Sequence, residues 1–351
     1  MNKILNKLLI LFFIFFLITM NITVIAYENQ KIINTNECDN DNFYFVHITD
    51  THLLNKINDT QEITKKRFIR VLNEINSFKD KPAFVVITGD LVEFGGSDYF
   101  GALNYQTFIN CLYEKNNYLY ADPSFTIPVY TTPGNHDYIW ETSLKNYHDY
   151  VDKKHESVND RYTISYMDTT LFFMDSGPNY ILEPWDWADV KGAGLYKDDI
   201  NWLESQLLSC SSKNKIVLMH HPAVNYRNDK GEMTNVIARN REEFIDLCNQ
   251  YDVDCVLAGH THNSVVFDSD ENIYNDFPLN CDDYSTLFVQ SDDCKQGIHY
   301  RNISIQDNSI FIKNSVELKC KPKNIFLKKP IFQQIIDILK ELQKDIFLYI
   351  K

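Results

Sequence analysis

Five short polar segments, each directly after an apolar run typical of a β-strand, constrain the fold more than any other feature of the chain. They are Asp50-Thr51-His52, Gly89-Asp90, Gly134-Asn135-His136-Asp137, His220-His221-Pro222 and Gly259-His260-Thr261-His262. The apolar runs before them cover residues 43–49, 83–88, 128–132, 215–219 and 254–258. In open α/β sheets, ligands bind beyond the carboxyl ends of the strands. We therefore expect the five segments to form one site.

Apolar residues at helical spacing alternate with these runs. The helical patterns cover residues 65–78, 103–113, 198–208 and 241–251. A hairpin is expected at residues 162–167 and 170–175, and further strands near 263–267, 285–290, 298–305 and 309–318. Short strands that alternate with helices predict an α/β domain with a mostly parallel central sheet.

The side chains in the five segments are typical of a site that holds two metal ions beside a phosphate ester. Two metals roughly 3.5–4 Å apart can share a carboxylate, lower the pKa of a bound water and neutralise phosphoryl oxygens. Carboxylate, amide and imidazole ligands without thiolate favour Fe, Mn, Zn or Co. The eight cysteines show no Cys-x-x-Cys spacing, so a zinc–thiolate site is not expected.

The longer strings around these segments resemble the calcineurin-like metallophosphoesterase superfamily. The closest resemblance is to its class III cyclic-nucleotide phosphodiesterase-like branch. It rests on Ile48-Thr49-Asp50-Thr51-His52-Leu53, Thr88-Gly89-Asp90-Leu91, Pro133-Gly134-Asn135-His136-Asp137 and Met219-His220-His221-Pro222, with a similar spacer at residues 194–207. The resemblance covers about residues 43–317 and implies a four-layer fold, in which a two-sheet β-sandwich is flanked by helices.

The resemblance also implies a role for each polar side chain, with two divalent or trivalent transition metal ions (Fe, Mn or Zn) as cofactors. The first metal would be held by Asp50, His52, Asp90 and His262, and the second by Asp90, Asn135, His220 and His260. Asp90 would bridge the metals together with a hydroxide that attacks phosphorus. His136 would donate a proton to the leaving oxygen or hold a phosphoryl oxygen, and Asp137 would orient His136. His221 either packs behind the ligands or contacts the substrate.

One departure separates this chain from a related group. The purple acid phosphatases resemble the pattern but have Gly in place of His52 and Tyr in place of Glu93. Because their purple colour comes from that Tyr ligand, we expect this chain to lack the colour.

The ends of the chain are expected to lie outside the catalytic domain. Residues 1–26, with Lys3 and Lys7 beside an apolar stretch, are typical of a signal peptide or an uncleaved signal anchor. A polar linker (27–42), a metallophosphoesterase domain (43–320) and a C-terminal amphipathic helix (321–351) follow. The expected location is extracytoplasmic, either secreted or tethered to a membrane. The C-terminal helix either covers the domain or lies on a membrane or a partner.

The net charge of −14 argues against nucleic acid as a main partner, because phosphate binding along a strand needs a basic surface. The sequence therefore predicts an exported phosphoesterase that acts on a small phosphomonoester or phosphodiester. Two alternatives remain open: a catalytically inactive metal-binding recognition module, and a membrane-associated protein of the same fold. Trp185 and Trp187, in an irregular insertion at residues 177–194, would form a lid or stack on a nucleobase.

Overall fold

The computed structural model describes residues 30–32, 42–55, 61–113, 125–139, 143–151, 161–177 and 194–319. The predicted targeting segment, the two tryptophans of the insertion and the C-terminal helix lie outside these residues and stay predictions. Apart from Lys319, the described residues belong to one compact unit, Met1–Leu318. Among them, no helix combines the length and the apolar character needed to cross a membrane.

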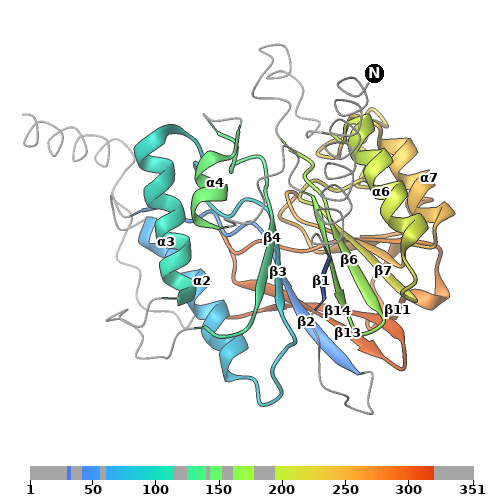
Figure 1. Ribbon diagram of the computed structural model, residues 1–351, viewed down its shortest axis with the longest axis horizontal. Helices are drawn as coiled ribbons and strands as arrows, with labels where there is room; N and C mark the ends of the chain where they lie inside the picture. The colour runs from blue at the N-terminus through green and yellow to red at the C-terminus, as the bar shows by residue number, and fades with distance from the viewer. Residues whose placement is uncertain are drawn as a thin grey trace, which may run out of the picture. The chain divides into compact units, whose positions relative to one another are not determined.

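The described strands form two mixed sheets (Figure 1). The six-stranded sheet has the order β11-β14-β13-β2-β3-β4, in which β2, β3 and β4 run parallel. Its strands are β2 (Phe43–Ile48), β3 (Val85–Thr88), β4 (Val129–Thr132), β11 (Leu279–Asn280), β13 (His299–Gln306) and β14 (Ser309–Glu317).

The eight-stranded sheet has the order β1-β5-β6-β7-β8-β12-β9-β10, in which β6, β7, β8 and β12 run parallel. Its strands are β1 (Gln30–Ile32), β5 (Tyr162–Tyr166), β6 (Thr169–Phe173), β7 (Asn214–Leu218), β8 (Cys255–Ala258), β9 (Val265–Phe267), β10 (Ile273–Tyr274) and β12 (Leu287–Gln290). Strand β1 lies within residues 27–42, which the sequence predicted as a polar linker.

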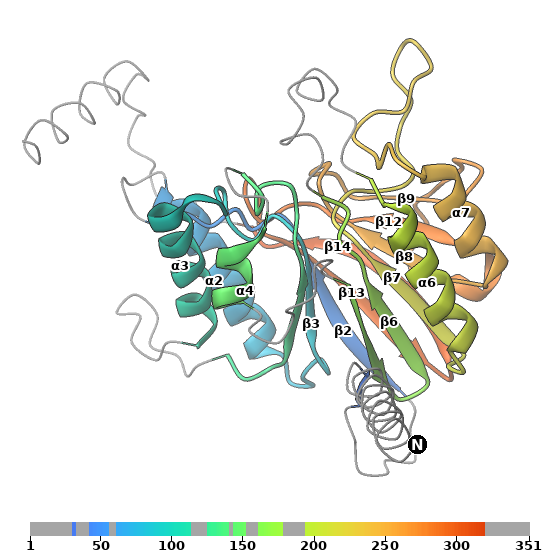
Figure 2. The ribbon, with the colours of Figure 1, turned by 45° about the horizontal axis from the view of Figure 1, so that its top comes forward.

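Helices cover the outer face of each sheet, so the unit has four layers, as the family resemblance implied (Figure 2). The six-stranded sheet packs against α2 (Gln61–Ser77), α3 (Ala102–Tyr113) and the short α4 (Lys145–Tyr150). The eight-stranded sheet packs against α6 (Lys197–Ser209) and α7 (Arg241–Gln250). The four longer helices were predicted, whereas α4 was not.

The alternation of side chains along each strand explains this layering. On β2, Phe45 faces the core between the sheets, while Val46 and Ile48 face the core under α2 and α3. Both faces are therefore apolar, and such strands read as continuous apolar runs. The prediction of one mostly parallel central sheet was wrong for this reason: a strand buried on both faces does not reveal which sheet it joins.

Candidate metal centre

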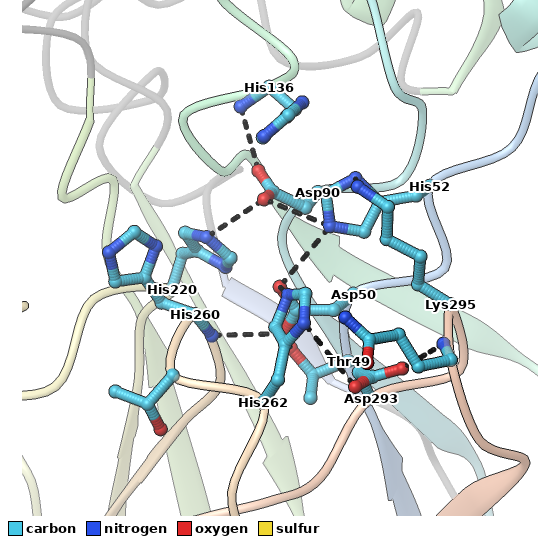
Figure 3. A network of polar contacts seen from close by, with 12 residues as sticks. Thr49, Asp50, His52, Asp90, His136, His220, His260, His262, Asp293 and Lys295 are labelled. Carbon is cyan, nitrogen blue, oxygen red and sulfur yellow. Dashed lines mark hydrogen bonds and ion pairs between the residues drawn. The ribbon is translucent and has the colours of Figure 1, made fainter. Parts of the chain in front are cut away.

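The five predicted segments meet where β2, β3, β4, β7 and β8 end, and they bring their polar side chains together (Figure 3). Contacts between the two sheets hold them in place. The His260 amide donates to Asp50 Oδ2 at 2.9 Å, and His220 Nδ1 lies 2.8 Å from the Thr88 carbonyl oxygen. The site therefore lies across both sheets, and neither sheet could form it alone.

The first predicted group of ligands is assembled around Asp50, which is fully buried. Its Oδ1 lies 3.2 Å from His262 Nε2 and 3.6 Å from His52 Nε2. His52 Nε2 is also 3.4 Å from Asp90 Oδ2. One ligand atom from each of Asp50, His52 and His262 lies within 4.8 Å of the other two, a spacing that suits a shared metal ion.

The second predicted group shares Asp90 with the first. Asp90 Oδ2 lies 3.3 Å from His220 Nε2, and the same nitrogen is 3.1 Å from Asn135 Oδ1. The rings of His220 and His260 lie 5.1 Å apart between centroids. Asp90 thus stands between the two groups, and the bridging role that the resemblance implied stays a prediction.

The backbone at the site adopts a conformation that the sequence did not reveal. Five of the seven predicted ligands have positive φ, a region that residues other than glycine rarely adopt. They are Asp50 (54°), His52 (44°), Asp90 (49°), His260 (67°) and His262 (52°). Such strain is concentrated at functional sites, where surrounding structure enforces it.

Close packing explains two glycines in the segments. Gly89 has φ of 78°, and a Cβ there would lie 2.6 Å from His220 Cγ. A Cβ at Gly259 would lie 1.8 Å from Thr49 Oγ1 and 2.5 Å from Asp50 Oδ2. Both glycines let the backbone of one segment approach the side chains of another.

The raised pKa values of two buried histidines support a cation beside Asp50 and Asp90. Burial alone would lower the pKa of His52, but the neighbouring carboxylates of Asp50, Glu93 and Asp90 outweigh it and raise that pKa to about 10. Burial likewise opposes the charge of His220, yet Asp90 and Asp50 raise its pKa to about 9. The two buried carboxylates thus attract positive charge from any available source.

Unpaired atoms point to the same conclusion. Asp50 Oδ1 and His52 Nε2 are buried, and neither has a hydrogen-bond partner among the described residues. Buried polar atoms normally find a partner, and exceptions at a ligand-like cluster suggest an ion. Carboxylate, amide and imidazole donors fit Fe, Mn or Zn. The residues present therefore fit the implied metals.

His136 and Asp137 occupy different surroundings. His136 Nδ1 lies 2.8 Å from the Glu93 carbonyl oxygen, and its ring stands 4.5 Å from that of His52. Its side chain is 25% exposed, and it borders the cluster (Figure 3). The carbonyl accepts the Nδ1 proton, which leaves Nε2 as the nitrogen available to a ligand.

The prediction that Asp137 orients the His136 ring was wrong. Asp137 Oδ2 accepts hydrogen bonds from the amides of Gly134 (2.8 Å) and Leu91 (3.2 Å), and Oδ1 accepts one from the Tyr105 hydroxyl. Burial and the neighbouring Asp90 raise the pKa of Asp137 to about 7, against these donors. Asp137 therefore fixes the two loops that carry Asp90 and Asn135.

His221 is held by a serine that the sequence did not indicate. Its backbone amide donates to Ser176 Oγ at 3.0 Å, and its Nδ1 lies 3.0 Å from the same oxygen. Burial and the nearby His260 hold the pKa of His221 well below its usual range, so the ring is neutral. Its ring packs 4.3 Å from that of His260. The ring is therefore buried against a predicted ligand, and both predicted roles, packing and substrate contact, stay predictions.

Three further side chains reach the site without having been predicted as site residues. They are Glu93, Asp293 and Lys295. Asp293 follows β12, which runs parallel to β8 and ends at the same edge. The rule that located the five segments would thus have located Asp293, had residues 285–290 been treated as a sixth strand of that edge.

Two mixed sheets, flanking helices and a buried carboxylate–histidine cluster together define a metallophosphoesterase. A family model described as Calcineurin-like phosphoesterase matches residues 43–264. The chain therefore belongs to the calcineurin-like phosphoesterase family, and it is a hydrolase of phosphoric ester bonds.

Individual relatives agree with this assignment. The chain is 27% identical over 224 residues to the probable glycerophosphodiester phosphodiesterase GpdQ of Arcobacter nitrofigilis, covering 62% of this chain and 71% of that protein. It is 24% identical over 206 residues to the glycerophosphodiester phosphodiesterase GpdQ of Enterobacter lignolyticus, covering 55% of this chain and 60% of that protein. The purple acid phosphatase PPD1 of yellow lupin shares the fold (TM-score 0.51, 13% identity, 82% of this chain and 58% of that one).

Proposed function

We propose that the chain is a two-metal phosphodiesterase acting on small phosphodiesters. The observation that carries this proposal is the position of Asp90, whose Oδ2 lies 3.4 Å from His52 Nε2 and 3.3 Å from His220 Nε2. One carboxylate oxygen thus faces ligands of both predicted metals. A single structural ion would not require a second set of ligands on the far side of Asp90.

When bound, two metal ions would lower the pKa of a water molecule and neutralise charge on the phosphoryl oxygens. Asp50, His52, Asp90 and His262 would hold one ion, and Asp90, Asn135, His220 and His260 the other. The protein supplies the geometry. Asp90 Oδ1 accepts a hydrogen bond from the His136 amide at 2.8 Å, which joins the Gly89-Asp90 segment to the segment that carries His136.

In this proposal, His136 would protonate the leaving oxygen. Its Nδ1 is occupied by the Glu93 carbonyl, and its ring borders His52. General acid catalysis of this kind contributes about 10²–10⁴-fold to the rate. The benefit depends on the leaving group, because a phenolate with a low pKa departs without a proton.

A His136→Ala variant should therefore lose activity selectively. We expect kcat to fall by about 10²–10⁴-fold for a diester with an alkoxide leaving group and much less for bis(p-nitrophenyl) phosphate. Metal content measured in parallel should match the wild type. Equal losses on both substrates would assign His136 to phosphoryl binding, and unchanged kcat on the alkoxide substrate would exclude it from proton transfer.

The relatives support a diester substrate, since two are named as glycerophosphodiester phosphodiesterases. Specificity resides in loops around the metal ligands, so the alcohol part of the ester is decided by experiment. A panel of glycerophosphodiesters, cyclic nucleotides and phosphomonoesters, tested on metal-replete protein, would rank them by kcat/KM. Preference for a monoester by more than about tenfold would contradict the proposal.

The colour of the protein provides an independent check. Glu93 stands where purple acid phosphatases have their Tyr ligand, and it contacts His52 Nδ1 at 2.8 Å. We expect iron-loaded protein to show no intense visible charge-transfer band. An absorption spectrum of the Fe-reconstituted protein tests this, and a strong band near that of a tyrosinate–iron site would contradict the predicted ligand set.

We also propose that the protein acts outside the cytoplasm, on the basis of Lys3, Lys7 and the apolar stretch at residues 8–18. N-terminal sequencing of protein recovered from cell fractions would test this. Intact Met1 in the soluble cytoplasmic fraction would contradict it.

A further inference from the structure

The connection formed by residues 291–298 runs past the first group of ligands. It leads from β12 in the eight-stranded sheet to β13 in the six-stranded sheet. Its backbone is bonded next to both sheets, since the Ser291 amide donates to Ala258 O of β8 at 3.0 Å and the Cys294 amide to Thr49 O, just after β2, at 3.2 Å. This connection lies outside residues 43–264, the part matched by the family model.

Asp293 supports one imidazole of the first group. Its side chain is buried, and Oδ2 lies 3.3 Å from His262 Nδ1 (Figure 3). Its Oδ1 accepts the amides of Gln296 and, at 3.3 Å, of Gly297. With Nδ1 of His262 occupied in this way, Nε2 faces Asp50 at 3.2 Å.

Lys295 supports the other imidazole through Glu93. Its Nζ lies 2.8 Å from Glu93 Oε2, and the same oxygen lies 2.8 Å from His52 Nδ1. The Lys295 carbonyl also accepts a hydrogen bond from Arg67 on α2, which restrains this part of the connection. His52 Nε2 is thereby directed toward Asp50 and Asp90.

The second group of ligands is supported differently. His220 Nδ1 lies 2.8 Å from the Thr88 carbonyl, a neutral backbone group. Carboxylates that accept the outer N–H of a ligating histidine fix its tautomer and raise its basicity. Only the first group has both of its histidines backed by carboxylates in the described part of the chain.

We infer that the 291–298 connection positions both imidazoles of the first metal, Asp293 directly through His262 and Lys295 through Glu93 and His52. Asp293, Glu93 and Lys295 are positioning residues, since Asp293 and Glu93 contact the Nδ1 atoms of His262 and His52, and Lys295 contacts Glu93. The inference rests on the proposed two-metal function. It adds that one metal position depends on a chain segment outside residues 43–264, the part that the family model matches.

The test compares Asp293→Asn and Lys295→Met with the control Asp292→Asn. An Asn at 293 retains an oxygen for the Gln296 and Gly297 amides but loses the charge facing His262. Asp292 is the matched control because its carboxylate lies beside His299 instead, at 3.6 Å, and an Asn there can still cap the Asp293 amide. Apo-protein of each variant would be titrated with Co²⁺ alone, and binding followed by calorimetry and by the visible d–d spectrum.

Both test variants should bind one of two Co²⁺ ions about 10–100-fold more weakly, while the other ion and the control stay within about twofold of wild type. Lys295→Arg, which keeps the cation, should restore most of the loss. If Asp293→Asn and Lys295→Met bind both ions as tightly as the wild type does, the inference is overturned and the proposed function still stands. Wild type that binds fewer than two ions would overturn the proposed function instead. Should Asp293→Asn fail to fold, the partly exposed Lys295 still decides the question.

Discussion

Replacement of Asp90 by alanine is expected to lower kcat/KM for a phosphodiester by at least about 10³-fold, or roughly 4 kcal/mol of transition-state stabilisation. The carboxylate is 2% exposed, and its Oδ2 lies between His52 and His220. Its loss removes a ligand from both predicted metals at once. It also leaves the His136 amide without its acceptor, Asp90 Oδ1.

Measuring metal content separates the loss of the Asp90 charge from the loss of its hydrogen bond to the His136 amide. Asp90→Asn keeps an oxygen for the His136 amide, yet we expect it to bind less than two equivalents of metal and to be nearly as inactive. The exposed Asp246→Ala on α7 is the control and should retain wild-type activity. Full activity of Asp90→Ala with metal supplied would exclude a bridging role and, with it, the proposed mechanism.

A second large effect is expected from Arg301→Ala, which should lower the free energy of unfolding by about 3 kcal/mol or more. Arg301 on β13 is fully buried. It donates to Lys313 O (2.7 Å), Ser264 Oγ (2.6 Å), Gln290 O (3.2 Å) and Ser291 Oγ (3.2 Å). Each buried acceptor left unpaired costs about 1–3 kcal/mol, and the truncation also opens a cavity.

The same arginine connects stability to the metal centre. Gln290 ends β12 in the eight-stranded sheet, so Arg301 on β13 joins the two sheets where β12 ends. Ser291 Oγ also lies 2.9 Å from His47 Nδ1, and His47 Nε2 lies 2.8 Å from Thr88 Oγ1. Burial and Arg301 lower the pKa of His47 to about 3, so this histidine stays neutral within the network.

Urea denaturation followed by circular dichroism would measure the change in stability. Arg227→Ala is the matched control, because its side chain is 50% exposed and its pairing with Glu271 should contribute no more than about 1 kcal/mol. A loss below about 1 kcal/mol for Arg301→Ala would show that water or neighbouring groups replace its hydrogen bonds.

The sequence located the predicted ligands because side chains that directly follow a strand gather at the carboxyl edge of the sheet. Asp50, Asp90, Asn135 and His220 each follow an apolar run, and the carboxyl ends of such strands gather polar side chains. The relation holds for this chain although its strands belong to two sheets. It could not assign Asp137 to a partner, because Tyr105, which is 32 residues away, is recognisable as a neighbour only after α3 has packed.

Side chains that support the ligands were harder to predict than the ligands themselves. Glu93 and Lys295 lie about two hundred residues apart, and each is an ordinary surface residue when read along the chain. Buried Arg301 is also unexpected from a strand pattern, since charged side chains are rarely fully buried. Their roles depend on distances between segments, for which a single sequence holds no signal.

By itself, therefore, the sequence indicated the family and seven candidate metal ligands, because both depend on residue type and on position after a strand. Only the tertiary structure decided how the strands divide into two sheets, that five ligands adopt positive φ, and which side chains hold them there. The physical reason is that ligand chemistry is local to a few bonded residues. The contacts of the 291–298 connection with Glu93 and His262 arise only when segments distant in the chain pack together. The same holds for the histidines that surround the buried carboxylates of Asp50 and Asp90.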